Sequence, residues 1–372
     1  MKIAFLMTAS DMVLSFRRNL IQHILSRGHK VIVIAYDRER KTEIESLGVK
    51  FYCVEQNNRG LNPVSMLKYK YLVQNILRKE CPDKVVTFQL KPNTWGVLAA
   101  KGARIKSVYS MVEGAGDVFT NKGLKWKIIR LFACFLYKNA FRYSKRVIFL
   151  NNDDKAEFVK RGLVSESKTH IIHGIGVDLD RFEKSEINNS QSFLMIARML
   201  ENKGVREYCE CARIVKKIYP SATFNYIGPE GNIKLADIQG YIEDGSVCYL
   251  GKVDDVRCYL RECGVFVLPS YREGVPMSVM EAEATGRPII TCNSIGCRET
   301  VLDGNNGFLV EPKNVQALAE KCIYMVEHSV EVKKMGANSR AFAEKHFDQK
   351  IINNRVCEII EVMDESFACT GI

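Results

Sequence analysis

Two segments in the second half of the chain carry charged side chains at spacings that suit chemistry on a diphosphate. In Leu194-Met-Ile-Ala-Arg198-Met-Leu-Glu-Asn-Lys203-Gly204, a strand is predicted to end at Arg198, and Lys203 opens the following helix. That spacing places two cations and a helix N-terminus at one rim of a sheet, which is the arrangement that binds a diphosphate. Two exposed cations in a loop are the alternative interpretation of this segment when it is taken alone.

The second segment places two carboxylates next to another predicted helix. The strand Val265–Leu268 leads into a loop that holds Glu273, and Glu281 follows on the helix. Pro276 suits the first turn of that helix, because the N–H that proline lacks is not needed there. Two carboxylates beside a helix N-terminus suit recognition of hydroxyl groups, and the backbone N–H groups remain available for phosphate. The segment therefore predicts a site for a ligand that carries both hydroxyl groups and phosphate.

Short apolar strands alternate with helical patterns along the chain, which indicates βαβ units and buried parallel sheets. The first series of predicted strands is Lys2–Met7, Val31–Ala35, Lys50–Val54, Lys84–Thr87, Ser107–Val112, Arg146–Leu150 and Lys168–Ile172. The second series is Phe193–Ala197, Thr223–Ile227, Ser246–Leu250, Val265–Leu268 and Pro288–Thr291. The predicted fold class is α/β: two doubly wound Rossmann-like domains that face each other across a cleft, with ligands at the carboxyl ends of the strands.

Other segments are predicted to be helical or to form loops. The helical patterns include Ser15–Arg27, Gly204–Lys217, Pro276–Thr285 and a long amphipathic one at Gln349–Phe367. Gly296, Gly304 and Gly307 predict a tight, glycine-supported loop behind the site. The chain up to Ser15 after the first strand is predicted to be a loop.

Charge is distributed unevenly between the two halves of the chain. Residues 1–175 carry 31 Lys and Arg against 14 Asp and Glu, whereas residues 176–372 carry 23 against 29. The asymmetry favours a domain boundary near residue 175 and an anionic partner for the first half. We therefore expect an N-terminal domain at 1–175 and a C-terminal domain at 176–348, with a helix at about 349–372 packing back on the first.

The densest basic stretch, Lys122–Lys138, has the pattern of an amphipathic helix. Its apolar arc comprises Leu124, Ile128, Leu131, Phe132, Phe135 and Leu136, and its cations include Lys122, Lys125, Lys127 and Arg130. Such a helix can lie on an anionic membrane surface. A helix whose apolar side faces its own core is the equally weighted alternative. Nucleic acid is disfavoured as the anionic partner, since no recognition-helix, zinc-finger or RNP pattern is present.

Several other classes of protein are excluded or disfavoured. The longest uncharged apolar runs are too short for a membrane span, and the N-terminal run is too short for a signal peptide. The 13 cysteines lack a CxxC pair and favour reduced thiols, hence a cytoplasmic protein. His170 and His173 lack partners at ligand spacing, so no metal site is predicted. The absence of GxGxxG after a strand disfavours a dinucleotide-dependent oxidoreductase.

In this order and spacing, these motifs resemble the donor site of glycosyltransferase family 4, whose members are retaining enzymes of GT-B fold. The resemblance rests on Arg198…Lys203, on Glu273 and Glu281 with seven residues between them, on Gly176-Val-Asp178, and on Gly296…Glu299…Gly304…Gly307. It covers the whole chain. Leu61-Asn-Pro63, Asn93–Lys101 and Val112–Gly116 narrow it to the bacterial α-1,3-N-acetylgalactosaminyltransferases that act on undecaprenyl-diphosphate-linked sugars.

The resemblance implies a role for each matching position. Arg198 and Lys203 would bind the donor diphosphate and stabilise it as it leaves, and Glu281 would hold the ribose hydroxyls. Glu273 would face the donor sugar together with the backbone of Gly274, Val275, Pro276, Met277 and Ser278, and Val253 would lie at the base. Retention would proceed by same-face attack with the leaving phosphate accepting the acceptor's proton, so neither an enzyme nucleophile nor a metal cofactor is expected.

Two positions depart from the family's pattern. The family commonly has a Gly-Gly pair in the first strand–helix loop, and this chain does not, so that contact with the donor phosphate passes to Ser15 or to backbone N–H groups. The family often has a histidine where Glu113 stands. We assign Glu113 to recognition of the donor sugar or the acceptor, with a buried structural carboxylate as the alternative.

The sequence thus predicts transfer of an N-acetylhexosamine, GalNAc in α-1,3 linkage, from a UDP-sugar to an undecaprenyl-diphosphate-linked saccharide. The predicted location is peripheral, on the inner face of the cell membrane. A UDP-sugar 2-epimerase of the same architecture is the enzymatic alternative, and a scaffold protein with a decayed site is the non-enzymatic one. The donor sugar stays open among GalNAc, GlcNAc, Gal and Glc.

Overall fold

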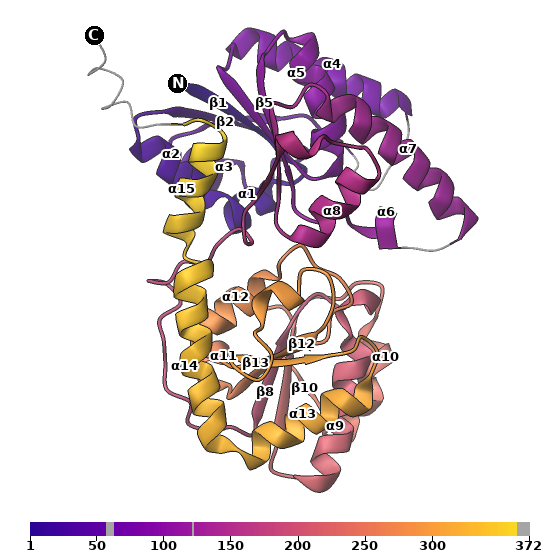
Figure 1. The fold of residues 1–372 in the computed structure, drawn as a ribbon, viewed down its shortest axis with the longest axis vertical. Helices are drawn as coiled ribbons and strands as arrows, with labels where there is room; N and C mark the ends of the chain where they lie inside the picture. Colours follow the sequence, from indigo (N-terminus) through magenta and orange to yellow (C-terminus); the bar gives the residue numbers. More distant parts are fainter. Residues whose placement is uncertain (57–62, 121–122, 363–372) are drawn as a thin grey trace. The chain divides into compact units, whose positions relative to one another are not determined.

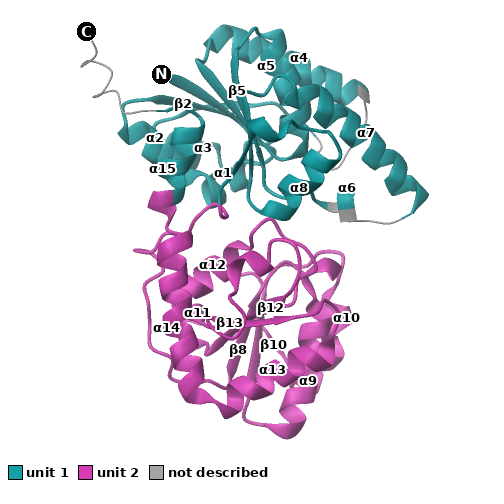
Figure 2. Ribbon diagram, viewed as in Figure 1, with its two compact units in different colours: residues 1–172, 352–372 teal, residues 173–351 magenta. Residues whose placement is uncertain are grey.

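The computed structural model describes residues 1–56, 63–120 and 123–362, and the chain divides into two compact units (Figure 2). Unit 1 comprises residues 1–172 and 352–372, and unit 2 comprises residues 173–351. The sequence boundary was placed at residue 175, three residues beyond the end of the first part of unit 1. Of the expected C-terminal helix, residues 363–372 lie outside the described part of the chain.

Unit 1 is built on a seven-stranded parallel sheet in the order β3-β2-β1-β4-β5-β6-β7. Its strands are β1 (Lys2–Leu6), β2 (Lys30–Ala35), β3 (Lys50–Cys53), β4 (Lys84–Phe88), β5 (Ser107–Val112), β6 (Arg146–Phe149) and β7 (Thr169–Ile171). Ala4 of β1 pairs with Ile32 of β2 on one side and with Val85 of β4 on the other. The order reverses between β1 and β4, and open α/β sheets bind ligands beyond the carboxyl ends of strands at such a point.

Helices cover both faces of this sheet. They are α1 (Ser10–Phe16), α2 (Arg18–Ser26), α3 (Lys41–Glu45), α4 (Pro63–Glu80), the π-helical turn η1 (Pro92–Gly96), α5 (Val97–Gly102), α6 (Asp117–Thr120), α7 (Leu124–Phe141), α8 (Asn152–Lys160), the 3₁₀ turn η2 (Glu166–Lys168) and α15 (Gln349–Ile359). Right-handed crossovers after β3, β4 and β5 put α4, α5 and α7 on one face. α15 lies beside α2 (Figure 1), where the Arg27 guanidinium donates to the Asn354 amide oxygen over 2.7 Å.

The single helix predicted at Ser15–Arg27 is two helices in the structure. α1 begins five residues earlier, and Arg17 separates it from α2 with a non-helical backbone (φ −128°, ψ −5°). The early start has a cause outside the local pattern: the Asp37 carboxylate, beyond β2, accepts a 3.1 Å hydrogen bond from the Ser10 N–H. That bond satisfies one of the free N–H groups of the first turn of α1.

Unit 2 contains a six-stranded parallel sheet in the order β10-β9-β8-β11-β12-β13. Its strands are β8 (Ser192–Ile196), β9 (Thr223–Ile227), β10 (Cys248–Tyr249), β11 (Val265–Leu268), β12 (Ile289–Cys292) and β13 (Gly307–Val310). The order reverses between β8 and β11, so this pair forms the switch point of unit 2. β13 replaces part of the predicted loop: Gly307 lies so close to β12 that a Cβ there would be 1.9 Å from the Ile289 carbonyl oxygen.

The helices of unit 2 follow the βα alternation, with small shifts from the predicted ends. They are η3 (Glu201–Lys203), α9 (Val205–Ile218), α10 (Leu235–Glu243), α11 (Arg257–Glu262), α12 (Met277–Ala284), η4 (Arg298–Thr300), α13 (Val315–Glu327) and α14 (Ser329–His346). Lys203 therefore ends a 3₁₀ turn rather than opening a helix. Pro276 is the N-cap of α12 rather than its first residue.

Candidate active site

Lys203 and Glu273, predicted from different segments, are in direct contact. The Lys203 ammonium donates to Glu273 Oε1, and both side chains are largely buried, with 22% and 12% exposed. The same carboxylate oxygen accepts a 2.7 Å hydrogen bond from the Ser270 hydroxyl. The carboxylate is thus oriented from two sides. Sequence reasoning did not single out Ser270, although it directly follows the proline at the end of β11.

Two glycines allow the loops of this site to touch. Gly204, with φ +72°, lies where a Cβ would be 2.2 Å from the Pro269 carbonyl oxygen, so the loop after β8 packs on the loop after β11. Gly296 backs the same loop, since a Cβ there would be 2.3 Å from the Glu273 carbonyl oxygen. The Glu273 N–H donates to the Ile295 carbonyl oxygen over 2.9 Å. Side chains larger than hydrogen would separate Lys203 from Glu273.

Arg198 follows β8 at the same switch point, and its side chain is exposed. Within residues 1–56, 63–120 and 123–362, its guanidinium forms no hydrogen bond or ion pair. The site therefore holds one cation that is already paired, Lys203, and one that is open to an anion. A guanidinium presents its donors in a planar fork that matches phosphate oxygens.

Glu281 lies on α12, whose N-terminus follows the carboxyl end of β11 after the loop that holds Glu273. The first N–H groups of α12, on Met277 and Ser278, have no partner within the helix and carry its partial positive charge. Burial raises the pKa of the half-buried Glu281 carboxyl to about 7, an effect opposed by Arg181 and reinforced by Asp255. Arg181 was not among the predicted residues.

Gly274 and Val275 continue the loop between Glu273 and α12, so the five predicted backbone positions from Gly274 to Ser278 form one stretch. Val253 is half-buried in the loop after β10. The Gly228 N–H donates to the Gly251 carbonyl oxygen over 2.9 Å, which joins that loop to the end of β9.

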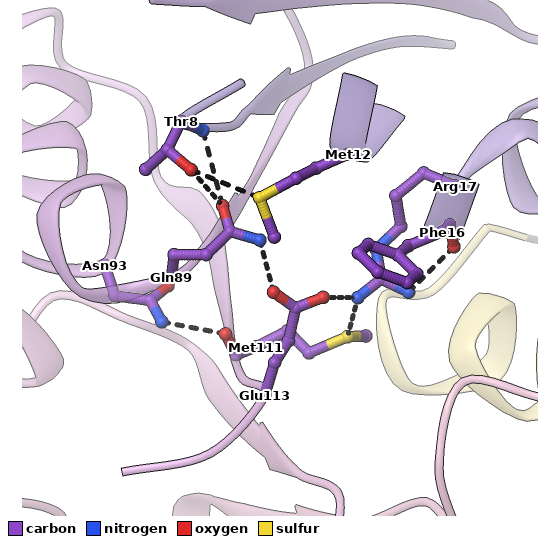
Figure 3. A network of polar contacts seen from close by, with 8 residues as sticks. All are labelled: Thr8, Met12, Phe16, Arg17, Gln89, Asn93, Met111 and Glu113. Carbon is purple, nitrogen blue, oxygen red and sulfur yellow. Dashed lines mark hydrogen bonds and ion pairs between the residues drawn. The ribbon is translucent and has the colours of Figure 1, made fainter. Parts of the chain in front are cut away.

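Glu113 is the centre of a polar network at the carboxyl end of β5 (Figure 3). The Arg17 guanidinium donates to one carboxylate oxygen and the Gln89 amide to the other. Arg17 is buried, with its guanidinium 4.6 Å from the centre of the Phe88 ring. Burial lowers the pKa of Arg17, and the Glu113 charge opposes this shift. A carboxylate offers about four acceptor positions, so Glu113 retains capacity for a ligand hydroxyl.

Gln89 connects this network to the first loop of the chain. It has φ +61°, a conformation that non-glycine residues adopt at a cost, and it directly follows β4. Its amide oxygen accepts from the Thr8 N–H over 3.3 Å, as Figure 3 shows. The side chains that meet here come from the ends of β1, β4 and β5, around the switch point of unit 1. Sequence reasoning missed Arg17 and Gln89, since neither lies in a recognisable motif.

Ser15 is exposed on α1 and not in a loop, which corrects the predicted local structure. Its role stays a prediction.

The basic amphipathic helix is α7, which begins at Leu124, and Lys122 lies outside the described residues. Lys125 and Lys127 are exposed, and the Arg130 guanidinium donates to the Val118 carbonyl oxygen over 2.8 Å. Of the six residues in the predicted apolar arc, only Leu136 is buried. The alternative of an arc that faces the unit's own core is therefore wrong for the other five.

Neither a cluster of metal ligands nor a helix fit to span a membrane occurs in the described part of the chain. Among the described residues, no three His, Cys, Asp or Glu side chains form a group that could hold a metal ion. The absence of a metal cofactor stays a prediction. No helix among those residues combines the length and the apolarity that crossing a bilayer requires. The cysteines of the described ranges are free thiols.

Comparison with known families matches each half of the chain. The family described as "Glycosyl transferase 4-like" matches residues 2–151, and "Glycosyl transferases group 1" matches residues 190–328. A protein of Campylobacter jejuni, N,N'-diacetylbacillosaminyl-diphospho-undecaprenol alpha-1,3-N-acetylgalactosaminyltransferase, is 32% identical over 97% of this chain and 98% of its own. The Escherichia coli UDP-Gal:alpha-D-GlcNAc-diphosphoundecaprenol alpha-1,3-galactosyltransferase is 27% identical over 76% of each chain.

Solved structures show the same fold. Anabaena HepE, crystallised with UDP-glucose, superposes with a TM-score of 0.80 at 20% identity, over 98% of this chain and 100% of that one. A glycosyltransferase from Rickettsia africae gives a TM-score of 0.76 at 20% identity, over 98% and 99% of the two chains. The two parallel-sheet units therefore form the GT-B fold, as the sequence predicted.

Proposed function

The chain belongs to the group 1 glycosyltransferases, with a glycosyltransferase 4-like first half, and from this membership we propose which sugar it transfers and to what. The donor is a UDP-N-acetylhexosamine, UDP-GalNAc by preference, and the acceptor is an undecaprenyl-diphosphate-linked saccharide that receives an α-1,3 bond. The full-length likeness to the C. jejuni transferase supports this choice. For the chemistry, the proposal is carried by the open Arg198 guanidinium, which lies in the same loop as Lys203, and by the pairing of Lys203 with Glu273 from the loop after β11.

In the proposed reaction, the bond between the sugar's anomeric carbon and the diphosphate oxygen breaks, and a bond to the acceptor hydroxyl oxygen forms on the same face. The hydroxyl proton passes to the departing diphosphate, so no group of the protein changes its protonation. Negative charge develops on the leaving oxygen. Arg198 and Lys203 then stabilise the transition state more than the ground state, which is what accelerates the step.

The remaining residues bind and orient the donor. Glu273, held by Lys203 and Ser270, accepts hydrogen bonds from the sugar hydroxyls. Glu281 accepts from the ribose hydroxyls, and the free N–H groups at the start of α12 donate to phosphate. Val253 lies against the base, and Ser15 of unit 1 donates to the diphosphate.

Glu113 recognises a hydroxyl of the donor sugar or of the acceptor. Its carboxylate is 16% exposed and is kept in place by Arg17 and Gln89. Because both protein partners donate to it, any ligand group that joins them must also be a donor. A hydroxyl or an N-acetyl N–H meets this condition.

The acceptor's lipid requires that the protein work at a membrane, which we place at the inner face of the cell membrane. The positive balance of residues 1–175 and the exposed cations Lys125 and Lys127 support an anionic surface as partner. Arg130 and Lys122 belong to the same basic stretch. No role in nucleic-acid binding is proposed.

Neither competing hypothesis gains support. The relatives described above are named as transferases, which decides against the UDP-sugar 2-epimerase. A scaffold with a decayed site does not account for an oriented Lys203–Glu273 pair next to an open Arg198.

The test is transfer by the purified full chain. A synthetic undecaprenyl-diphosphate saccharide is incubated with UDP-GalNAc, UDP-GlcNAc, UDP-Gal or UDP-Glc. The molecular mass of the lipid product is then measured by mass spectrometry. We expect a mass increase of one N-acetylhexosamine, largest with UDP-GalNAc, and a much smaller yield of this product with Arg198→Ala. Absence of product with all four donors would contradict the proposal.

A further inference from the structure

Two helices of unit 1, α4 and α7, expose large apolar side chains. We call this set the α4–α7 face; it comprises Val64, Leu67, Tyr71 and Leu72 of α4 and Leu124, Ile128, Leu131, Phe132 and Phe135 of α7. Leu124 and Leu131 are 75% and 73% exposed, far more than apolar side chains at the edge of a core. Large exposed apolar surface on a folded domain marks an interaction site.

Both helices belong to one layer of the unit. α4 and α7 each contact η1, and both cover the face of the sheet that the right-handed crossovers after β3 and β5 prescribe (Figure 1). Val73 of α4 and Ala140 of α7 are buried in the same core cluster with Val97. The outward sides of both helices therefore belong to the outer surface of that layer.

The exposed apolar residues of α4 follow from its helical period. Met66, Tyr69, Val73 and Leu77 are buried, at intervals of three and four residues, and form the inward stripe. Leu67, Tyr71 and Leu72 lie on the outward side, where a surface helix that faces water normally carries charged or polar residues. α4 is thus apolar on both sides over its first half.

The exposed charges on α4 and α7 themselves are of one sign. α7 contains no Asp or Glu and carries exposed Lys125, Lys127 and Lys138. α4 carries exposed Lys68, Arg78 and Lys79. Its one carboxylate, Glu80, is buried and paired with Lys50 and Lys2. Apolar side chains surrounded by cations and without exposed carboxylates complement an anionic lipid surface.

We propose that α4 and α7 together form the membrane-binding face of unit 1, with α4 inserting Leu67, Tyr71 and Leu72 between the head groups of an anionic bilayer. The inference deepens the proposed function, on which it rests for the acceptor that a bilayer would present. The inference adds α4 to the basic stretch Lys122–Lys138 that the sequence singled out. It also predicts that apolar side chains contribute to membrane binding together with the lysines.

The first test is partition of the purified full chain onto phosphatidylcholine vesicles with and without phosphatidylglycerol, measured by sedimentation. Leu67→Gln, Tyr71→Gln and Leu72→Gln are combined in one variant. A matched control carries Ile218→Gln, Leu302→Gln and Val330→Gln, three comparably exposed apolar positions of unit 2. We expect the α4 variant to lose at least tenfold in partition to the anionic vesicles and the control to lose less than twofold. Equal partition of the two variants would overturn the role of α4.

The second test places a reporter on α4 itself. Trp126 and Trp95 are the chain's two tryptophans. Tyr71→Trp in the Trp126→Phe background should show fluorescence quenching by brominated phospholipid, beyond the quenching seen with Trp126→Phe alone. No additional quenching would mean that α4 stays in water, even if the first test had shown weaker binding.

The proposed transfer reaction can fail separately from this inference. A short-chain, water-soluble acceptor bypasses the bilayer, so the α4 variant should use it as fast as the parent chain does. A parent that binds anionic vesicles but glycosylates neither acceptor would contradict the proposed substrates and leave the membrane-binding face intact. An α4 variant that loses activity on the soluble acceptor as well would contradict a role confined to the membrane.

Discussion

At the scale of single residues, the site contains one cation without a protein partner among the described residues, Arg198, and one that is already paired, Lys203. Arg198 is exposed and has no partner in the described part of the chain, so Arg198→Ala should leave the free energy of unfolding within about 0.5 kcal/mol of the parent value. It should lower kcat by about 10²–10³, as loss of a donor that stabilises transition-state charge does. Lys333→Ala, an exposed lysine of unit 2, is the control and should change neither quantity. An Arg198→Ala enzyme with more than a tenth of the parent kcat would contradict the role.

Glu281 supplies the pH dependence. Burial raises its pKa to about 7, so a falling pH protonates the carboxyl and removes the acceptor for the two ribose hydroxyls. We expect the KM for the donor to rise as the pH falls from about 8 to about 6, and Glu281→Gln to flatten this dependence. A KM profile that is the same in parent and variant would show that another group titrates.

The same shift has a consequence for stability. The folded pKa lies above the unfolded value of about 4.3, so ionisation of Glu281 opposes folding, and stability is lost as the pH rises through 7. Glu281→Gln should therefore be more stable than the parent at about pH 8, and this advantage should vanish near pH 4. Thermal unfolding of both proteins across that range measures it.

Sequence reasoning singled out Arg198, Lys203, Glu273 and Glu281 because their types and spacing suit a diphosphate and hydroxyl groups, and the structure brings Lys203 and Glu273 into contact. Sequence reasoning did not predict Arg17 or Gln89. Their contacts with Glu113 depend on where α1 ends and on a left-handed backbone after β4, and neither property is visible in a local pattern.

At the scale of elements, the contact between two loops depends on Gly204. An alanine there would adopt φ +72° and would bring its Cβ to 2.2 Å from the Pro269 carbonyl oxygen. Gly245→Ala is the matched control, since Gly245 has φ +71° with nothing within 4 Å of the added Cβ. The control should lose about 1–2 kcal/mol of stability and no activity.

Gly204→Ala should lose clearly more stability than Gly245→Ala, and kcat as well, because Lys203 and Glu273 are carried on the two loops that must separate. Thermal unfolding and initial rates of the two variants provide the comparison. Equal losses of stability with unchanged kcat in both would show that the loops do not need this contact.

The strands could be predicted where the sequence contains an apolar run of several residues. β11, for example, begins and ends as predicted. β13 was missed because four residues after a pair of asparagines give no period, and its pairing with β12 depends on close approach at Gly307. α1 was missed because its capping carboxylate, Asp37, comes from another part of the chain. Contacts between distant segments set both features.

At the scale of the whole molecule, the chain returns to unit 1 after completing unit 2. Glu361, in the last described turn, binds to the rest of unit 1 through its side chain. Its carboxylate pairs with the Lys145 ammonium over 2.6 Å and accepts a 2.9 Å hydrogen bond from the Tyr109 hydroxyl. The hydrogen bond from Lys145 is the main reason that the pKa of Glu361 falls to about 2. This stabilisation is present above the unfolded pKa of about 4.3 and is lost as the pH falls through 2.

Glu361→Gln should therefore lower the melting temperature at neutral pH, and its difference from the parent should shrink as the pH drops below about 4. Glu358→Gln, which breaks only an exposed pair with Arg355, should shift the melting temperature little at any pH. Equal shifts of the melting temperature in the two variants would mean that the contacts of Glu361 do not stabilise the C-terminal part of the chain. The charge asymmetry predicted a division near residue 175, and the sequence also predicted that the C-terminal helix packs back on the first domain. The contacts of Glu361 with Lys145 and Tyr109 follow only from the folded chain.

The central claim is that the chain transfers a sugar from a UDP donor with retention of configuration and leaves the donor unchanged when no acceptor is present. Proton NMR of UDP-GalNAc with the purified chain, before and after a lipid-diphosphate acceptor is added, tests this claim most directly. The account predicts an unchanged donor spectrum before addition. After addition, it predicts an α-linked anomeric signal that grows in step with released UDP. Conversion of the donor in the absence of acceptor, or a β-linked product in its presence, would contradict it.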